Sequence, residues 1–225
     1  MSIEWLPFVL QTSDPLFPTG AYAHSFGLEE WVRLSGAKDE AALLRFIDLQ
    51  ILPALTCQEL PYLRFLHTAS GKISTLITLD HEINAWKIPS ELRAASLRLG
   101  SRRLDILLKT APTPLLAEIS TRITSRETPG HHLTISAIQY AGIPLEAALM
   151  TYLYQTLSSY CVAALKLLRI GQEACQRVLT AILEKAPACL LHSLEIQHPQ
   201  AGCFNPLLEI ASMRHQSAFE RLFIS

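Results

Sequence analysis

Two cysteines and two histidines near the carboxyl end are the side chains best suited to chemistry, because thiolate and imidazole groups bind transition metals. Cys189 and His192 are three residues apart, which places them on one face of a helix, and His198 and Cys203 follow in the next loop. Together they could hold zinc or nickel. Cys189, however, lies in an apolar run and has the character of a core residue. We therefore favour packing for these residues and predict no bound metal.

A second possibility is hydrolysis, which needs a nucleophile and a base that is itself oriented. The candidates near the amino end are Ser13, Asp14, His24 and Ser25. Neighbours in sequence rarely have that geometry, and Ser13-Asp14 directly before Pro15 is more typical of a turn or a helix cap. The adjacent pair His131-His132 points its side chains in different directions. We therefore predict no catalytic residues.

Motifs for nucleotide binding and hydrolytic chemistry are missing from the sequence. None of the nine glycines forms GxxxxGK(S/T) or GxGxxG, and neither HExxH nor GxSxG occurs. We therefore expect no nucleotide, no cofactor and no enzymatic activity. A formal net charge of -1 also argues against a nucleic-acid-binding protein, which normally carries a basic surplus.

The composition is apolar: hydrophobic residues make up 49% of the chain and charged residues only 17%. Since ordinary soluble domains are about a quarter charged, this chain buries much surface within itself or against partners. Residues 147–165 carry no charge but include several hydroxyl and amide side chains, which favours a buried central helix over a membrane span. Five cysteines without a CxxC pair, and an amino end without a basic region, favour a cytoplasmic protein with reduced thiols.

Helical periodicity extends over almost the whole chain. Predicted helices begin near Asp39, at Pro89-Ser90, at Thr113-Pro114, at Pro144 and at Gln172, the last two running to about Ile170 and Glu195. Pro53 and Pro61 should interrupt the first helix, and Gly100 should kink or end the second. The β-branched run over residues 73–78 is the only strand signal, and an isolated strand is not stable. The sequence thus predicts an all-α, single-domain bundle of about eight to ten helices over residues 1–225.

Residues 11–29 are unusually rich in proline and glycine for a helical protein. Pro18-Thr19-Gly20 should form a tight turn that starts a helix over residues 22–28. Gly27 would lie inside this helix at a cost of about 1 kcal/mol relative to alanine, which suggests that another backbone approaches closely there. That neighbour is either a partner protein or another helix of the same chain.

Residues 205–225, which we call the tail, keep a large apolar content, although chain ends are usually polar and frayed. The apolar side chains are Ile210, Met213, Phe219, Leu222, Phe223 and Ile224. Burying one such side chain is worth about 1.5–3 kcal/mol, so these groups must pack on the body of the protein or on another protein. We expect a tail that is loosely held in the isolated chain and becomes ordered on a partner.

These two segments resemble the signatures of the UreF-type urease accessory proteins. The first is similar to the pattern LQ-x-S-(D/S)-x-x-(L/F)-P-x-G-(G/A)-(F/Y)-(A/S)-x-S-x-GLE, and the second resembles PLL-x-IASMRHE-x-x-YSRLFRS. Segments that match the family in order between them are Ala95-Ser96, Arg102-Arg103-Leu104, Gly142 to Glu146, Tyr152 to Tyr154 and Gly171-Gln172. The resemblance therefore covers essentially the whole chain. Gln216, Phe219 and Ile224 are the departures from the tail pattern.

The resemblance implies an all-α protein that tends to form homodimers and catalyses no reaction itself. Members of the family bind the accessory protein UreD, also called UreH, and together with it recruit the GTPase UreG. The resulting complex acts on apo-urease, and GTP hydrolysis by UreG accompanies nickel insertion. The implied role is a scaffold that modulates the GTPase.

The two segments, taken with the resemblance, predict the partner-binding residues. In the first segment these are Pro18, Gly20, Tyr22, His24, Ser25 and Glu29. In the tail they are Ser212, Arg214, His215, Phe219, Leu222 and Phe223. Arg214 is well suited to a partner carboxylate because its planar guanidinium stays charged and pairs bidentately.

Two other functions remain open from the residues alone. A helical hydrolase would use His24 or the His131-His132 pair. A metal-storage or metal-sensing protein would use the cysteines and histidines near the carboxyl end. Co-purification with UreD-like and UreG-like proteins would distinguish the scaffold from both alternatives.

Overall fold

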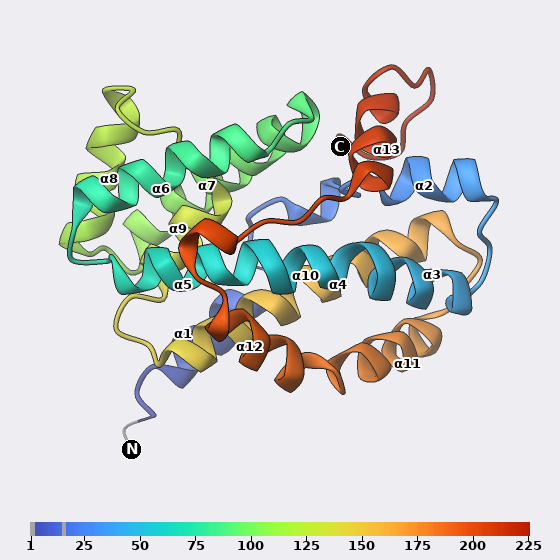
Figure 1. Cartoon of the computed structure of the whole chain (residues 1–225), viewed down its shortest axis with the longest axis horizontal. Helices are drawn as coiled ribbons and strands as arrows, with labels where there is room; N and C mark the ends of the chain where they lie inside the picture. Colours follow the sequence, from blue (N-terminus) through green and yellow to red (C-terminus); the bar gives the residue numbers. More distant parts are fainter. Residues whose placement is uncertain (1–2, 15–16) are drawn as a thin grey trace.

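The computed structural model describes residues 3–14 and 17–225, and within them the chain is helical throughout, with no strand (Figure 1). The helices are α1 (Leu6–Ser13), α2 (Leu28–Ser35), α3 (Glu40–Phe46), α4 (Leu52–Ala54), α5 (Leu60–Thr68), α6 (Ile73–Trp86), α7 (Ser90–Thr110), α8 (Pro114–Thr124), α9 (His132–Gln139), α10 (Leu145–Leu167), α11 (Gln172–Leu183), α12 (Ala186–Glu195) and α13 (Pro206–Gln216). The prediction of an all-α fold is confirmed.

The helix starts predicted at Asp39, Pro89-Ser90, Thr113-Pro114, Pro144 and Gln172 are confirmed, and the first and third have a capping side chain. Asp39 caps α3 by accepting a hydrogen bond from the Ala42 amide at 2.8 Å. Thr113 caps α8 in the same way, with the Leu116 amide at 3.2 Å from its hydroxyl oxygen. Pro114 occupies the first turn of α8, where its missing N–H has no helical acceptor to lose.

The first long helix is not interrupted by Pro53 and Pro61, and that prediction is wrong. Helices α3, α4 and α5 form one continuous helix, joined by π-helical turns at Ile47–Ile51 and Leu55–Glu59. Each π turn ends directly before a proline segment, with the Leu52 amide bonded to the Ile47 carbonyl and the Leu60 amide to the Leu55 carbonyl. The wider turn accommodates the proline ring and its missing donor, so the chain continues as a helix.

The opposite error occurs between Gln172 and Glu195, where one helix was predicted and two are present. Helix α11 ends at Leu183 and α12 begins at Ala186, with Pro187 in its first turn. Pro187 cannot donate to the Leu183 carbonyl, and here no π turn compensates, so the axis changes direction at this point.

The core lies between the long α3–α5 helix and α10, which run side by side through the middle of the molecule (Figure 1). Helices α6, α7 and α8 cover one side and α11 and α12 the other, while α9 is enclosed between α5 and α7. Fully buried side chains such as Phe46, Leu63, Leu107 and Leu153 fill this core. Helix α10 is the buried central helix that the sequence predicted, since Leu149, Leu153 and Leu157 are fully buried. Within the described residues, no helix is both long and apolar enough to cross a membrane.

Gly100 does not end α7, which continues through it from Ser90 to Thr110. The glycine is needed for space, because a Cβ at this position would lie 2.1 Å from the Gly130 carbonyl oxygen and 3.0 Å from the His132 nitrogen. The backbone that leads into α9 therefore touches the backbone of α7.

A buried carboxylate holds that same segment. Asp80 of α6 is fully buried and accepts hydrogen bonds from the Thr128 hydroxyl and the Gly130 amide at 2.6 Å each. The His131 amide at 3.0 Å and the Thr134 hydroxyl complete the set. Four donors from one turn thus converge on one side chain and determine where α9 begins.

Candidate functional site

The first signature segment is a turn rather than the predicted helix. Ala21–Ala23 form a single 3-10 turn, His24 is extended, and Gly27 is the N-cap of α2 with φ of +87°. Phe26 also has a positive φ, so two consecutive residues adopt the left-handed conformation and the chain cannot continue as a helix across them.

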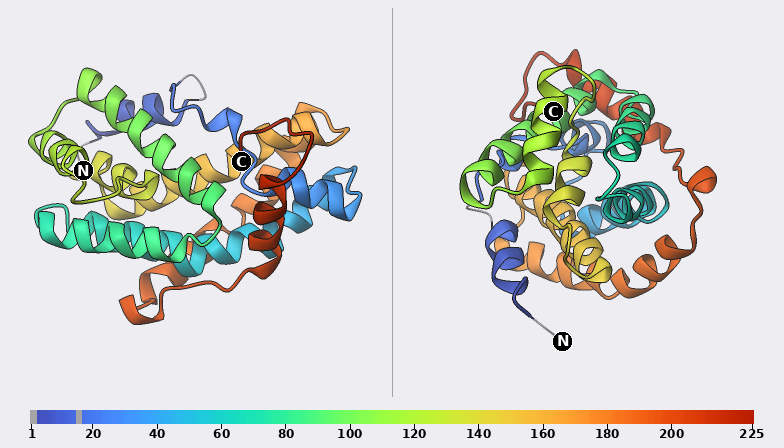
Figure 2. Two further views of the ribbon diagram at one scale, coloured as in Figure 1. Left: turned by 90° about the horizontal axis from the view of Figure 1, so that it is seen from above. Right: turned by 90° about the vertical axis from the view of Figure 1, so that its left-hand side faces the viewer.

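A close neighbour at Gly27 is present and belongs to the same chain, but its closest atoms are those of side chains, whereas the prediction was of a backbone. A Cβ on Gly27 would lie 2.8 Å from Leu208 Cδ1 and 3.0 Å from Ser212 Oγ, both on α13. Figure 2 shows α13 packed against α2. The two signature segments, which lie at opposite ends of the sequence, therefore form one joint surface.

The last residue of the tail is bound by the first segment. The Ser225 carbonyl oxygen accepts hydrogen bonds from the Ser25 amide at 2.5 Å, the Phe26 amide at 3.1 Å and the Ser25 hydroxyl at 2.9 Å. The Ser225 hydroxyl lies 2.6 Å from His24 Nδ1. Consecutive amide donors around a left-handed turn form a concave site for a hydrogen-bond acceptor, and here the Ser225 carbonyl oxygen occupies it.

Glu29 is the second anchor of the tail. Its carboxylate accepts hydrogen bonds from the Leu222 amide at 2.7 Å and the Phe223 amide at 3.0 Å. His215, which is 1% exposed, lies between Glu29 at 3.0 Å and Glu91 at 2.8 Å, with one ring nitrogen facing each carboxylate. The imidazole therefore connects a carboxylate of α2 to a carboxylate of α7 and places α13 against both helices.

Glu30 provides a third contact beside the first two. It is buried and receives two bonds of 2.6 Å from Arg33 and one of 3.1 Å from Arg214 of α13. The hydrogen bond from Arg33, followed by that from Arg214, lowers the pKa of the Glu30 carboxyl against the opposing effect of burial. Arg214 thus already has a carboxylate partner within the chain.

The expectation of a loosely held tail is wrong for this structure. That expectation rested on the apolar content of the tail alone. In the structure, hydrogen bonds at His215, Glu29 and Ser225 hold the tail on the body. Phe223 is buried, and the Lys166 ammonium lies 5.2 Å from the centre of its ring. Of the two options left open, the single-chain docking is what the structure shows for these residues.

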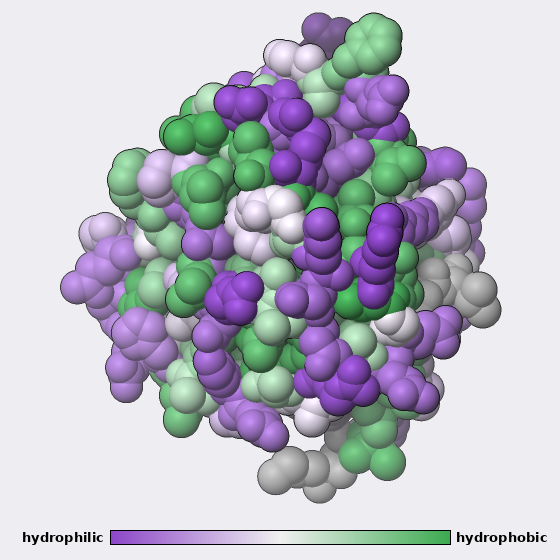
Figure 3. Space-filling model, turned by 90° about the vertical axis from the view of Figure 1, so that its right-hand side faces the viewer, coloured by the Kyte–Doolittle hydropathy of each residue, from purple (hydrophilic) through white to green (hydrophobic). Residues whose placement is uncertain are grey.

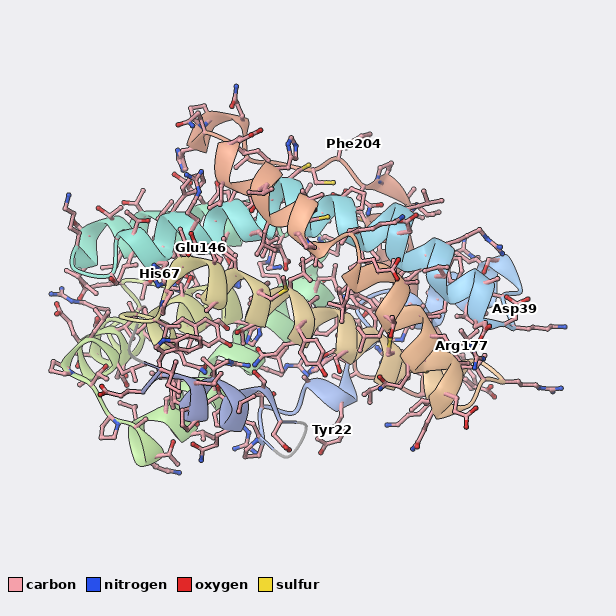
Figure 4. The ribbon with its side chains drawn as sticks, turned by 90° about the horizontal axis from the view of Figure 1, so that it is seen from below. Tyr22, Asp39, His67, Glu146, Arg177 and Phe204 are labelled. Atoms are coloured by element: carbon pink, nitrogen blue, oxygen red, sulfur yellow. The ribbon has the colours of Figure 1, made fainter. Side chains whose placement is uncertain are left out.

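The predicted partner-binding residues therefore divide into two groups. Those that join the tail to the body, and are buried or partly buried, are His24, Ser25, Glu29, Ser212, His215 and Phe223. Those that face outward are Pro18, Tyr22, Arg214, Phe219 and Leu222, with Gly20 at an intermediate position. Tyr22 points away from the body in Figure 4. No observation here tests partner binding, so the assignment stays a prediction.

The outward group is strongly apolar for an ordered surface. Phe219 is fully exposed, Leu222 is 72% exposed and Tyr22 is 68% exposed. Sequence reasoning missed Phe204, which lies just before the tail and is also largely exposed. Figure 3 shows the side of the molecule that carries α2 and α13, where apolar residues alternate with charged ones. We call Tyr22, Phe219 and Leu222 the exposed apolar group.

The other candidate sites do not assemble. Within the described residues, no group of three or more histidine, cysteine or acidic side chains is arranged to hold a metal, and His198 is bonded instead to Glu82 at 2.7 Å. Ser13 donates to the Val9 carbonyl rather than to a base. His131 is buried against Ser96 and Asn84.

The buried state of His24 leads to a pH prediction. Burial, aided by the positive charge of Arg98, lowers the pKa of its imidazole from 6.5 to about 4. As the pH falls, His24 is therefore protonated in the unfolded chain before it is protonated in the folded protein. The contribution of neutral His24 to the free energy of unfolding is complete above pH 6.5 and is lost as the pH falls toward 4. Between pH 7 and pH 5, the free energy of unfolding of the wild type should fall more than that of a His24→Asn variant, measured by urea denaturation.

The variant is a matched control because other buried histidines, including His131, also have lowered pKa values and persist in both proteins. Equal losses in the two proteins would show that His24 accepts a proton in the folded state at no cost, and would contradict the prediction.

Comparison with known proteins identifies the family of the chain. A family model described as UreF matches residues 37–183. The chain is 30% identical to the urease accessory protein UreF of Arthrobacter sp. (strain FB24), over 96% of this chain and 95% of the relative. It is 30% identical to the UreF of Paenarthrobacter aurescens (strain TC1), over 100% of both chains, and 28% identical to that of Bacillus sp. (strain TB-90), over 96% and 97%. The chain therefore belongs to the UreF family.

Proposed function

We propose that this protein is a non-enzymatic urease accessory protein that binds a UreD-type (UreH) partner and, with it, recruits the GTPase UreG to apo-urease for nickel insertion. Membership of the UreF family and the names of the relatives support the accessory role. The protein acts in the cytoplasm as a homodimer and modulates the GTPase. It provides a binding surface for its partners and catalyses no reaction itself.

The observation that carries the proposal is the exposed apolar group, of which Phe219 and Leu222 lie on the docked tail. An ordered backbone fixes Phe219 and Leu222 in water, while their neighbour Phe223 is buried. Aromatic and aliphatic side chains held in this way are typical of the centre of a protein–protein interface, where a few residues supply most of the affinity. Arg214, half exposed beside Glu30, adds a cation at the edge of the same surface.

Co-purification from a shared expression host tests the proposal. The double substitution Phe219→Asp and Leu222→Asp should reduce capture of the UreD-like protein, and with it the UreG-like protein, by at least about tenfold, because two desolvated anchors are lost. Leu191→Asp is the matched control: Leu191 is also exposed, at 65%, but lies on α12, on the other side of the core.

The control variant should capture both partners like the wild type. Full capture by the double variant, with its helical content unchanged by circular dichroism, would show that the tail surface is not the binding surface. Failure of the wild type to capture either partner would count against the proposed role itself.

A further inference from the structure

A cavity of about 430 Å³ lies between the first signature segment, the long α3–α5 helix, α7, α9 and α10. Its volume is within the range of about 300–1,000 Å³ that is typical of small-molecule sites. Most of its wall is apolar, with side chains such as Leu55, Leu92 and Leu99. The proposed assembly role makes no use of it.

One charged side chain in this wall lacks a counterion. Arg103 of α7 is 4% exposed, and within the described residues no carboxylate lies at ion-pair distance from it. Its hydrogen bonds go to neutral amides, from Nη1 to Gln139 Oε1 at 2.6 Å and from Nη2 to Gln155 Oε1 at 3.4 Å. Its Nε donor has no partner in the described part of the chain. Burying a cation without an anion is costly, so this arrangement is incomplete by itself.

The other charged groups of the wall do not supply that anion. Glu59 is engaged by Lys87 at 3.4 Å and by the Tyr152 hydroxyl at 2.9 Å. Asp14 is also on the lining and is an exposed residue. His132 also lines the cavity, and burial, together with the charges of Arg103 and Lys87, holds the pKa of its imidazole well below the ordinary value. Its Nδ1 has no partner among the described residues.

We propose that this cavity binds a small organic carboxylate with an apolar body, whose carboxylate pairs with Arg103 and whose hydrocarbon part contacts the leucines of the wall. A guanidinium is planar and pairs with a carboxylate through two parallel bonds, each stronger than a bond between neutral groups. A single unpaired cation suits a monoanion. Apolar walls disfavour a heavily hydrated ion such as phosphate, so the ligand needs a hydrocarbon portion.

Titration of the purified full-length protein with octanoate, followed by calorimetry, tests this inference. The wild type should bind octanoate at one saturable site, and octan-1-ol, which has the same chain without the charge, at least tenfold more weakly. Arg103→Gln should weaken octanoate binding at least tenfold. Arg102→Gln is the matched control, because Arg102 is the adjacent residue on α7 but is exposed, and this variant should bind like the wild type.

A second variant, which keeps Arg103, tests the cavity without changing the buried charge. Leu92→Trp places a larger side chain in the wall, and it should abolish octanoate binding while circular dichroism shows an unchanged helical content. Equal affinity for octanoate and octan-1-ol, or wild-type affinity in the folded Arg103→Gln or Leu92→Trp protein, would overturn the proposal. So would the absence of saturable octanoate binding to the wild type. None of these results depends on the partner proteins.

Discussion

Replacing Glu29 with alanine should release the end of the tail from the body while α2 remains folded. Glu29 accepts hydrogen bonds from the amides of Leu222 and Phe223 and pairs with the buried imidazole of His215. An unpaired buried hydrogen-bonding group typically costs about 1–3 kcal/mol, and Glu29→Ala removes the acceptor of two amides and the neighbour of one ring nitrogen. Here Glu91 still faces His215, so we expect a loss near the lower end of that range.

The release can be measured residue by residue. Amide hydrogen exchange at residues 222–225 should approach the rate of an unstructured chain in Glu29→Ala, whereas exchange in the core of α10 should be little changed. Glu220→Ala is the matched control, since Glu220 is an exposed acid of the same tail and should leave exchange as in the wild type. Retained protection of the Leu222 and Phe223 amides in Glu29→Ala would contradict this account of docking.

Glu29→Ala also tests whether docking of the tail affects binding of the UreD-like protein. If the docked tail presents Phe219 and Leu222 to a partner, an undocked tail must be ordered again on binding. The apparent affinity then equals the affinity of the docked form multiplied by the fraction of molecules that are docked. Capture of the UreD-like protein by Glu29→Ala should therefore decrease but not vanish, in contrast to the double aspartate variant. Equal capture by the wild type and Glu29→Ala would show that the tail does not need to be pre-arranged.

Replacing Asp80 with alanine should cause the largest loss of stability. Four donors around Asp80 would lose their acceptor together, namely the amides of Gly130 and His131 and the hydroxyls of Thr128 and Thr134. Each unpaired buried donor costs about 1–3 kcal/mol, and although relaxation and water entry reduce the sum, we expect a loss of at least about 4 kcal/mol. The free energy of unfolding from urea titration measures it.

Two further variants test whether the loss of stability comes from the hydrogen bonds that Asp80 accepts. Asp80→Asn keeps the shape and one acceptor oxygen, so it should lose less stability than Asp80→Ala. Asp105→Ala removes an exposed acid of α7 and should change the free energy of unfolding by less than about 0.5 kcal/mol. A loss below about 1 kcal/mol in Asp80→Ala would mean that the turn before α9 is held by packing against Gly100 rather than by the carboxylate.

Much of the local structure was predictable because its causes are local. Asp39 and Thr113 cap helices through bonds to amides three residues away, and an uncharged stretch with helical periodicity predicted α10. The errors also have local explanations. Pro53 and Pro187 are the same residue type, yet one is accommodated by a π turn and the other accompanies a helix break, and a single sequence does not show which will occur.

The sequence by itself therefore determined the fold class, the starts of α3, α7, α8, α10 and α11, and the resemblance to the UreF family. The tertiary structure decided which distant groups meet: Ser225 binds to Ser25, 200 positions earlier, and Asp80 binds a turn about fifty residues later. It also decided that Arg103 lies in a cavity without a carboxylate partner among the described residues, whereas the adjacent Arg102 is exposed. Caps and periodicity act over one helical turn, but burial and charge pairing depend on how the helices pack, and packing brings together residues that no local pattern connects.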